Sequence, residues 1–334
     1  MHSELQNSTT PEVPATLMPT ESGDREPGIC IVCRGPLVQH VNSVYDTRFG
    51  IDGIYEVWRC GWCQLEQMFP VPAPAQLKSL YESHYNFGGE KGTLYTSLRE
   101  SFFSSFLYRL WIRLDGDLSF HGRKGTGRLI DIGCNEGRGL QIYARNGFQV
   151  EGCELNETAA AVARDRGFIV HTHPVGEFTI SAPYDVAVLS NVLEHAPDPL
   201  QMLLDTREIL LPNGRLWVSC PNSQSWLRNV FGKYWINWHV PFHISQFSPQ
   251  TMTTLMEQAG FTRIEIRQVT PAVWVAMSII AKMFAKEGQP TRQLRNPVLV
   301  VALLSLIRFA AFPALWFQNR RGRGDCLLIT ASKA

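Results

Sequence analysis

The feature that most constrains the fold of this chain is an apolar run that passes through a glycine-rich turn into an amphipathic segment. It occupies residues 128–140 and reads Arg-Leu-Ile-Asp-Ile-Gly-Cys-Asn-Glu-Gly-Arg-Gly-Leu. This order is typical of a strand that enters a helix through a tight turn, where glycines let the main chain approach a ligand closely. The stretch therefore predicts an α/β unit with a ligand site at the carboxyl end of its strand.

The rest of the chain after Gly127 alternates short apolar runs with amphipathic stretches. This alternation indicates a parallel sheet with helices on both faces. The predicted fold class is thus α/β, a doubly wound, Rossmann-like sheet of seven mostly parallel strands. We expect strands near 128–133, 149–154, 168–173, 184–190, 215–220, 262–269 and 326–332, and helices at 136–146, 157–166, 198–210 and 249–259. The last of these helices begins with Ser248-Pro249, an N-cap residue followed by proline at the first helical position.

Two Cys-x-x-Cys pairs precede this region, Cys30 with Cys33 and Cys60 with Cys63, and 26 residues separate the pairs. The spacing is typical of a zinc ribbon, in which two turns direct four thiolates at one Zn²⁺ ion. Because protein would fill all four positions, we expect a structural zinc that supplies the folding free energy of a small module. The alternative is a set of unligated core cysteines. A redox role would need one pair at the start of a helix, and nothing in the sequence places either pair there.

The length of 334 residues allows two globular units, and the charges nearly cancel, with 31 Lys and Arg against 30 Asp and Glu. With this balance, no overall charge attracts the chain to nucleic acid or to an anionic bilayer. Local basic patches are still compatible with the composition. We expect a disordered tail over 1–28, the ribbon over 29–70, a helical linker or cap over 71–126 and the main domain over 127–334, with a hydrophobic helical insertion at about 271–319. The absence of a signal-peptide core and the scattered remaining cysteines predict a reducing cytoplasm.

Two acidic residues point to the ligand of the main domain. Asp131 precedes the first glycine, Gly133, where a carboxylate would repel a pyrophosphate and attract an ammonium group. Glu154, 23 residues later, ends the next strand and is placed to accept hydrogen bonds from both hydroxyls of a ribose. This pattern favours S-adenosylmethionine over a dinucleotide. The alternative is a pair of ordinary acids at strand ends.

With these motifs, residues 128–261 resemble the class I S-adenosylmethionine-dependent methyltransferase family, in its bacterial branch near the ubiquinone-biosynthesis and sugar methyltransferases. Residues 184–199 resemble the family's fourth strand with the turn that follows, and residues 210–219 resemble the entry into the fifth. Asn135 departs from the glycine of many relatives, but asparagine tolerates left-handed geometry and the turn should persist. The resemblance implies that the cofactor is bound by Asp131, Gly133, Gly137, Glu154 and Asn191.

The resemblance also suggests the chemistry. Zinc-ribbon fronts occur among the family's sugar C-methyltransferases, but those carry a further large C-terminal domain that is missing here, so we expect transfer to oxygen. A base helps when the acceptor is a hydroxyl, and the candidates near the cofactor's methyl group are His195, His239 and His243. His195 can instead cap the following segment. Some quinone O-methyltransferases place a divalent metal near the equivalent of Glu194-His195, but Asn191 stands where they have another acid, which argues against a metal here.

Three apolar stretches remain. Residues 102–114 carry apolar side chains at helical spacing, which predicts a helix packed on the sheet. The aromatic run over 234–239 suits the wall of an acceptor pocket and a hydrophobic lid equally well. Residues 297–317 are long enough to span a bilayer, yet Arg308 and Pro313 interrupt them and the next strand must return to the same sheet. We expect a helical insertion that covers the acceptor site or contacts a membrane surface, helped by Arg320, Arg321 and Arg323, and a soluble lid is equally compatible with the sequence.

The sequence thus predicts a cytoplasmic methyltransferase, peripheral at the inner face of the membrane if 297–317 contacts lipid. Its acceptor would be a small molecule or saccharide, with a lipid-linked form included. An RNA methyltransferase would need a basic stripe with interleaved aromatics on the ribbon, and the near-neutral charge argues against nucleic acid as a partner. A scaffold protein that binds the cofactor without turnover is a further alternative. A nicotinamide-dependent enzyme is disfavoured by the acid before Gly133.

Overall fold

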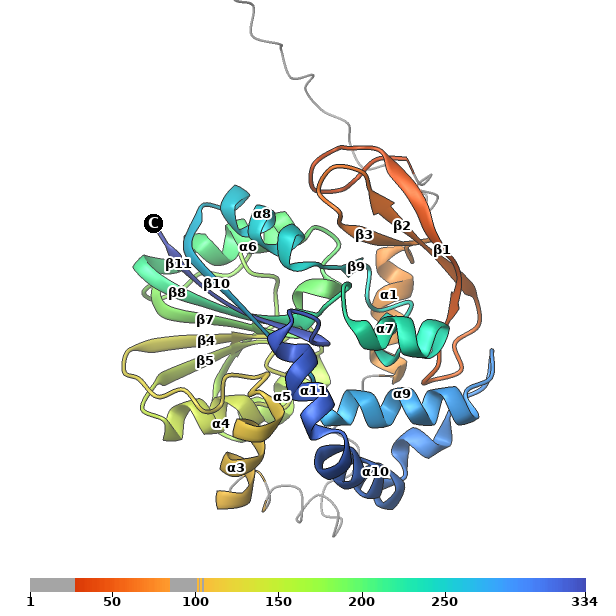
Figure 1. The fold of residues 1–334 in the computed structure, drawn as a ribbon. Helices are drawn as coiled ribbons and strands as arrows, with labels where there is room; N and C mark the ends of the chain where they lie inside the picture. Colours follow the sequence, from red (N-terminus) through yellow and green to blue (C-terminus); the bar gives the residue numbers. More distant parts are fainter. Residues whose placement is uncertain (1–27, 85–100, 102, 104) are drawn as a thin grey trace, which may run out of the picture.

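The computed structural model describes residues 28–84, 101, 103 and 105–334, and its centre is a seven-stranded sheet (Figure 1). The strand order is β10-β11-β8-β7-β4-β5-β6. Neighbouring strands are parallel except where β11 pairs with β8 and β10. The predicted doubly wound, mostly parallel fold is therefore confirmed. The strands are β4 (Arg128–Ile132), β5 (Gln149–Cys153), β6 (Ile169–His171), β7 (Tyr184–Ser190), β8 (Leu210–Pro221), β10 (Phe261–Val269) and β11 (Cys326–Lys333).

Helices cover both faces of this sheet, as the alternating pattern predicted. On one face α4 (Arg138–Arg145) and α5 (Glu157–Asp165) share a cluster of buried side chains, and α6 (Pro199–Glu208) and α8 (Pro249–Gln258) pack on the other (Figure 1). The central strand β7 has no exposed surface along residues 186–189. Continuous burial of this kind is expected of a parallel strand that helices cover from both sides.

Several helix starts follow directly from local sequence. Ser248 accepts a hydrogen bond from the Thr251 N–H at 3.1 Å, which confirms the predicted cap before α8. Asp198 does the same for the Gln201 N–H at the start of α6, and a proline follows each of these caps. Side-chain caps satisfy backbone N–H groups that the first helical turn leaves without a partner.

The front of the chain forms a second sheet that the main domain completes. Strands β1 (Leu37–Tyr45), β2 (Ile54–Cys60) and β3 (Glu66–Phe69) pair antiparallel in sequence order, and β9 (Ser245–Gln246) pairs with β3 from far along the chain. The front segment and the main domain therefore share one sheet, a connection that the sequence did not predict.

The other helices lie outside this framework. Three of them, α9 (Ala272–Phe284), α10 (Pro297–Ala310) and α11 (Phe312–Arg320), lie between β10 and β11, where the helical insertion was expected. The remaining helices among the described residues are α1 (Pro74–His84), α3 (Phe106–Asp115), α7 (Trp226–Phe231) and the short 3₁₀ turns η2 (Leu193–His195), η3 (Gly232–Tyr234), η4 (Ile236–Trp238) and η5 (Arg292–Arg295). The predicted tail over 1–28 lies outside the described residues except for Gly28.

The insertion is bent and is fixed to α3. Within the part of the chain that the structure describes, no single helix is both long and apolar enough to cross a membrane. Only α10 and α11 together pass that test, and they meet at an angle of 68°. Arg308 of α10 is buried and forms an ion pair with Asp115 of α3, whose carboxylate also accepts the Ala272 N–H of α9 at 2.9 Å. One buried carboxylate therefore joins three helices.

The outward face of α3 differs from the prediction. Its buried residues are Tyr108, Ile112 and Asp115. Four of the apolar residues that its spacing assigned to the sheet are instead 44–75% exposed, namely Phe106, Leu107, Leu110 and Leu114. Phe103 and Trp111 are half-buried, and Phe102 lies outside the described residues. The predicted packing of this helix was wrong, because periodicity identifies an apolar face without saying what covers it.

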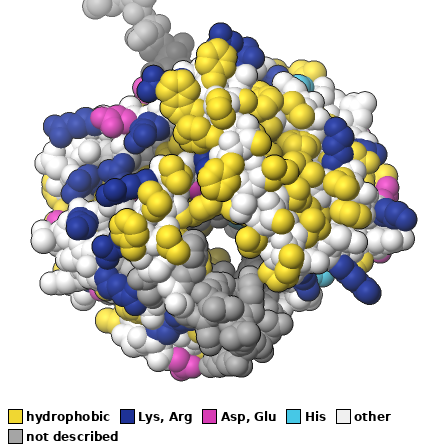
Figure 2. Space-filling model, turned by 60° about the horizontal axis from the view of Figure 1, so that its bottom comes forward, with side chains coloured by type: hydrophobic (Ala, Val, Ile, Leu, Met, Phe, Trp, Pro, Cys, Tyr) yellow, Lys and Arg dark blue, Asp and Glu magenta, His cyan; other side chains and the backbone are white. Residues whose placement is uncertain are grey.

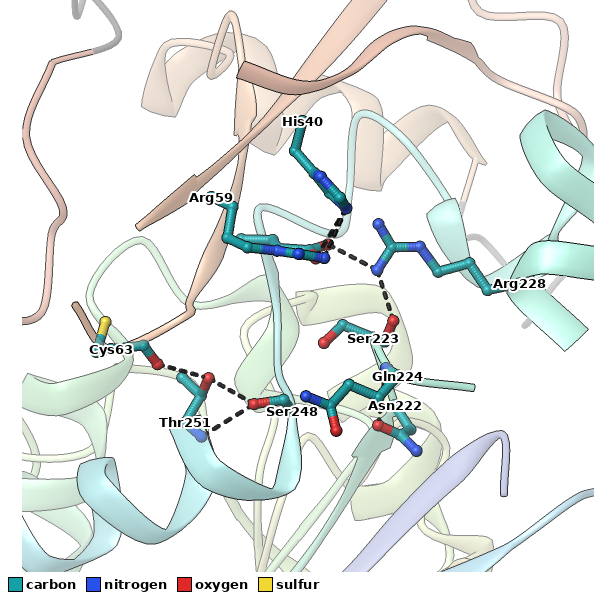
Figure 3. A network of polar contacts seen from close by, with 10 residues as sticks. His40, Arg59, Cys63, Asn222, Ser223, Gln224, Arg228, Ser248 and Thr251 are labelled. Carbon is teal, nitrogen blue, oxygen red and sulfur yellow. Dashed lines mark hydrogen bonds and ion pairs between the residues drawn. The ribbon is translucent and has the colours of Figure 1, made fainter. Parts of the chain in front are cut away.

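A buried ion network joins β3 to the loop after β8 (Figure 3). One carboxylate oxygen of Glu66 accepts hydrogen bonds from Arg59 at 2.6 and 3.0 Å, and the other lies 2.8 Å from Nη1 of Arg228 in α7. Glu66 and Arg228 are 1% and 7% exposed. Arg228 also donates to the Ser223 carbonyl at 2.6 Å. Figure 3 shows His40 and Arg59 approaching from the front sheet and Arg228 from the other side.

Replacing Glu66 by alanine should destabilise the protein strongly. The change leaves the buried Arg228 guanidinium without its carboxylate, and breaking a buried pair in this way costs about 3–5 kcal/mol. We expect a loss of that size in the free energy of unfolding, measured by urea denaturation.

Glu157→Ala is the matched control, because Glu157 pairs with Arg164 at 2.6 Å but is 68% exposed. An exposed pair of this kind contributes under about 1 kcal/mol. Equal losses from the two variants would contradict the structural role assigned to Glu66.

Candidate functional site

The glycine-rich turn between β4 and α4 has the left-handed geometry that its sequence predicted. Gly133 and Gly137 have φ of 76° and 75°, and a Cβ atom at Gly133 would lie 2.5 Å from the side chain of Val192. Asn135 has φ of 49°, so the turn keeps its left-handed geometry at this position, as expected. The Asn135 side chain supports this geometry by accepting the Glu136 N–H at 2.8 Å.

Glu154, just after β5, is held in a fixed orientation by the main chain. One carboxylate oxygen accepts the Asn135 N–H at 2.9 Å and the other accepts the Asn156 N–H at 2.8 Å. Burial raises the pKa of Glu154, and these backbone hydrogen bonds oppose that shift. Because a carboxylate oxygen has two acceptor sites, each oxygen keeps capacity for one further donor. The arrangement suits a ligand with two neighbouring hydroxyl groups.

Asp131 lies near the end of β4, the strand beside β5, and is 7% exposed. Burial, and secondarily the negative charge of Glu154, raises its pKa to about 7. A Cβ atom at residue 139 would lie 2.8 Å from the Asp131 carboxylate, so Gly139 leaves room for this side chain. A buried acid in this state gains from a cationic ligand that stabilises its charged form.

Asn191 follows β7, the other neighbour of β4. It has φ of 54°, and its N–H donates to the Ser219 carbonyl at 2.9 Å. Its side-chain oxygen is buried and has no hydrogen-bond partner among the described residues. Each residue predicted to bind the cofactor therefore lies at or just beyond the carboxyl end of one of three adjacent strands, and their roles in binding stay predictions.

Three histidines and one glutamate form a second cluster next to this edge. His195 and Glu194 belong to η2 after β7, whereas His239 and His243 lie in the loop between η4 and β9. His239 Nδ1 is 3.3 Å from His243 Nε2, and His243 Nε2 is 3.9 Å from the Glu194 carboxylate. The rings of His195 and His243 have centroids 4.6 Å apart. The structure thus brings together the three histidines that the sequence proposed as bases.

Burial controls the charge of this cluster. It lowers the pKa of His195 to about 4 and lowers the pKa values of His239 and His243 well below their ordinary value. It raises the pKa of Glu194 to about 8. Both carboxylate oxygens of Glu194 are buried and lack hydrogen-bond partners among the described residues. A buried, unpaired carboxyl group is costly, so this position favours a proton or a bound cation.

Two of the histidines are oriented by backbone carbonyls. Nδ1 of His243 lies 2.8 Å from the Asn237 carbonyl, and Nδ1 of His195 lies 3.1 Å from the Phe242 carbonyl. An Nδ1–H that donates to a carbonyl leaves Nε2 as the acceptor of its ring, as in most histidine ligands of metals. Tyr81 of α1 adds a contact of 2.8 Å from its hydroxyl to His195 Nδ1. Nothing in the sequence pattern of α1 marks Tyr81 as a site residue.

The ligand atoms of Glu194, His195 and His243 lie within 4.8 Å of one another and can hold a metal ion. The sequence argued against a metal at Glu194 and His195 because Asn191 replaces an acid there. That argument was incomplete, since it did not include His243, which lies beside the pair because the Ile244 N–H donates to the Glu194 carbonyl at 2.9 Å. The donor set of one carboxylate and two imidazoles suits a divalent transition metal.

The four cysteines of the front segment converge as their spacing predicted. The sulfur atoms of Cys30 and Cys63 are 3.6 Å apart and those of Cys33 and Cys60 are 3.3 Å apart. In a tetrahedral zinc site with bonds of about 2.3 Å, neighbouring sulfurs would be roughly 3.8 Å apart. The cluster therefore fits a metal ion with four thiolate ligands.

The two cysteine turns have matching local geometry. Arg34 and Gln64 each follow the second cysteine of a pair, with φ of 60° and 63°. The Trp62 N–H lies 3.4 Å from the sulfur of Cys60 and donates to it, as expected of a turn whose backbone points at the ligand. No described cysteine forms a disulfide.

The aromatic run over 234–239 belongs to the core. Trp235 and Trp238 are 0% and 3% exposed, and their indole N–H groups donate to Asp325 at 2.8 Å and to the Gly232 carbonyl at 2.9 Å. They pack against α9 in one hydrophobic cluster. These two side chains therefore do not line an open pocket, and the hydrophobic lid stays a prediction.

Comparison with known proteins assigns the chain to a family. A family model described as "Methyltransferase domain" matches residues 87–266. Two curated relatives are named ubiquinone biosynthesis O-methyltransferase. The protein from Sodalis glossinidius (strain morsitans) is 29% identical over 140 residues, which cover 39% of this chain and 56% of the relative. The one from Maricaulis maris (strain MCS10) is 28% identical over 163 residues, which cover 45% and 63%.

The chain thus spans about six tenths of the length of these relatives. Among solved structures, an S-adenosylmethionine-dependent methyltransferase from Thermotoga maritima aligns with a TM-score of 0.46 and 19% identity. That alignment covers 77% of this chain and all of the other.

The cysteine cluster predicts a tightly bound metal. We expect Cys60→Ser to lose the cysteine-bound zinc and to lower the melting temperature by about 5–10 °C, because metal binding supplies folding free energy. Metal analysis and thermal melting test this, and cobalt substitution reports the thiolate site through its charge-transfer absorption.

Cys326→Ala, in β11, is the control and should keep the metal. A metal-free wild-type protein with an unchanged melting temperature after chelation would contradict the assignment.

Proposed function

This chain belongs to the methyltransferase-domain family, and on that basis we propose that it transfers a methyl group from S-adenosylmethionine to an oxygen of a small-molecule or saccharide-type acceptor. The observation that carries the proposal is the pair of acids at the ends of β4 and β5. Glu154, held by two backbone N–H groups, would accept the ribose hydroxyls. Asp131, buried with a raised pKa, would attract the ammonium group of the methionine part.

The remaining cofactor contacts follow from the same edge of the sheet. Gly133 and Gly137 would let the main chain pass close to the ligand, since neither carries a Cβ atom and both have positive φ. The unpaired side-chain oxygen of Asn191 would accept a hydrogen bond from the bound cofactor.

Transfer to oxygen is supported by the names of the two relatives, both O-methyltransferases. Their names also place them in ubiquinone biosynthesis, which is compatible with an acceptor linked to a lipid. Methyl transfer requires the acceptor's lone pair in line with the sulfonium methyl, so positioning can supply much of the rate.

The histidine cluster would receive the proton of the acceptor hydroxyl. All three histidines are neutral at pH 7, because burial lowers their pKa values. We assign the base to His243, whose Nδ1 contact with the Asn237 carbonyl keeps Nε2 as acceptor. His195 and His239 are alternatives in the same cluster.

A second role of this cluster is supported by the unpaired carboxylate of Glu194. Its two oxygens, with the imidazoles of His195 and His243, fit a divalent metal ion. When bound there, such an ion would lower the pKa of a coordinated acceptor hydroxyl. In that arrangement Glu194, His195 and His243 hold the metal, and His239 is the histidine left to act as base.

The alternatives from the sequence receive less support. An RNA methyltransferase would need a basic ribbon, but residues 28–70 contain three arginines against four acids. A scaffold that only binds the cofactor would not need the buried histidines, although binding without transfer to any acceptor would support it. Structural zinc on the four cysteines remains part of the proposal and rests on their convergence.

Cofactor binding gives the first test. We expect calorimetric titration of zinc-replete protein to show micromolar binding of S-adenosylmethionine and none of NADH. Asp131→Ala and Glu154→Ala should each weaken binding by about 10- to 100-fold, since each removes charge-assisted contacts.

Glu157→Ala, exposed in the first turn of α5, is the control and should bind normally. Because the pKa of Asp131 is raised to about 7, affinity should fall as pH is lowered through that value, and Asp131→Asn should abolish this dependence. Folded protein that binds no S-adenosylmethionine would refute the proposed function.

The metal role predicts a further binding event. With the cysteine site loaded, we expect the protein to bind a second divalent ion, measured with Mn²⁺ or Co²⁺. Glu194→Gln and His243→Ala should lose it and lower methyl transfer by about 100-fold or more.

His173→Ala, an exposed histidine after β6, is the control and should leave both properties unchanged. If no second ion binds and only His243→Ala loses activity, the metal role is excluded and the base role of His243 stands.

A further inference from the structure

Positive charge is concentrated in the insertion between β10 and β11. The whole chain is nearly balanced, yet residues 271–324 hold eight Lys and Arg against one acid, Glu287. Seven of these basic residues are exposed: Lys282, Lys286, Arg292, Arg295, Arg320, Arg321 and Arg323. The eighth, Arg308, is used internally in the ion pair with Asp115.

The same region exposes large apolar side chains. On α10, Val298 and Phe309 are 77% and 85% exposed. Further exposed side chains come from α3, α9, α10 and α11: Phe106, Leu107, Met283, Val301, Leu306, Trp316 and Phe317, between 46% and 75% exposed. Figure 2 shows one face on which hydrophobic side chains gather, with Lys and Arg around them and few acids. Exposed apolar area of this extent marks an interaction surface.

The four helices form one continuous surface because they are joined internally. α10 packs on α9 and is fixed to α3 by the ion pair of Arg308 with Asp115. The inward side of α10 packs in the core, since Ile307 is 6% exposed and belongs to a hydrophobic cluster with residues of α9. The large apolar side chains on the other side of these helices therefore face solvent in the folded protein.

We propose that the outward faces of α3, α9, α10 and α11 form a docking surface for an anionic phospholipid bilayer, with the helices lying in the headgroup region. Apolar side chains would enter the acyl boundary while the basic side chains contact lipid phosphates. Arg320 and Arg321 lie over the rings of Trp316 and Phe317, at 4.2 and 4.0 Å from the ring centroids. Aromatic rings beside basic groups are typical of residues at a membrane interface.

The charge distribution decides between this partner and a second copy of the chain. A symmetric dimer through this surface would bring two sets of like charges together, whereas an anionic bilayer complements them. Crossing the bilayer is disfavoured by the 68° angle between α10 and α11. The surface goes beyond the proposed methyl transfer and does not depend on it, because it lies on other side chains than the acids and histidines of the site.

Vesicle flotation of the full chain tests the proposal. We expect binding to phosphatidylcholine vesicles that contain phosphatidylglycerol, little binding to phosphatidylcholine alone, and weakening by salt. The double variant Val298→Ser, Phe309→Ser should lower the partition coefficient by about tenfold or more, because it removes two apolar side chains that would be buried in the bilayer. The triple variant Arg320→Ser, Arg321→Ser, Arg323→Ser should lower it similarly and reduce the salt dependence.

Matched controls are Val38→Ser, which removes a 63% exposed valine from β1, and Lys124→Ser, which removes an exposed lysine outside the insertion. Both should bind vesicles as the wild type does, and unchanged melting temperatures show that every variant is folded. Absence of binding to anionic vesicles, or equal binding by all variants, would overturn the proposal. A lipid-free dimer that Phe309→Ser dissociates would also overturn it, in favour of a second copy.

Discussion

The pairing of β3 with the segment around β9 is the interaction on which the candidate site depends. Met68 donates its N–H to the Ile244 carbonyl, and Ile244 donates its own N–H to the Glu194 carbonyl, both at 2.9 Å. These two hydrogen bonds connect the cysteine-bearing sheet to the residue beside His243 and to the η2 turn after β7. The buried ion pair of Glu66 in β3 with Arg228 in α7 joins the same two parts of the chain. The front segment therefore helps to position the loop that carries His243 against the η2 turn that carries Glu194.

The site combines several buried groups whose protonation is displaced from the ordinary state. Asp131 and Glu194 are acids held toward neutrality, and the three histidines are bases held neutral. A core designed for stability alone would avoid such groups, because each costs free energy until a ligand pairs with it. Their concentration at one sheet edge is typical of a site for binding and catalysis. Burying charged groups at this edge lowers the stability of the folded protein. Continuous apolar strands such as β7 offset that loss.

The sequence predicted what depends on near neighbours. Apolar runs gave the strands of the main sheet, Ser248-Pro249 gave a helix start, and the turn around Asn135 kept its shape because asparagine tolerates positive φ. What it missed depends on contacts between distant segments. The two residues of β9 are too few to carry a strand pattern, so the shared sheet could not be inferred. The grouping of the three histidines was predicted only through the family resemblance. Periodicity identified α3 but could not say that Phe106 faces outward.

The shared sheet also has a consequence for the order in which the chain folds during synthesis. The ribosome makes β3 long before β9, so the cysteine-bearing sheet must wait with an unpaired edge while most of the main domain is still being added. Unpaired strand edges invite pairing with the wrong chain. A metal ion captured early by the cysteines would keep this edge attached to a compact unit. The supply of metal to the nascent chain would then limit the yield of correctly assembled protein.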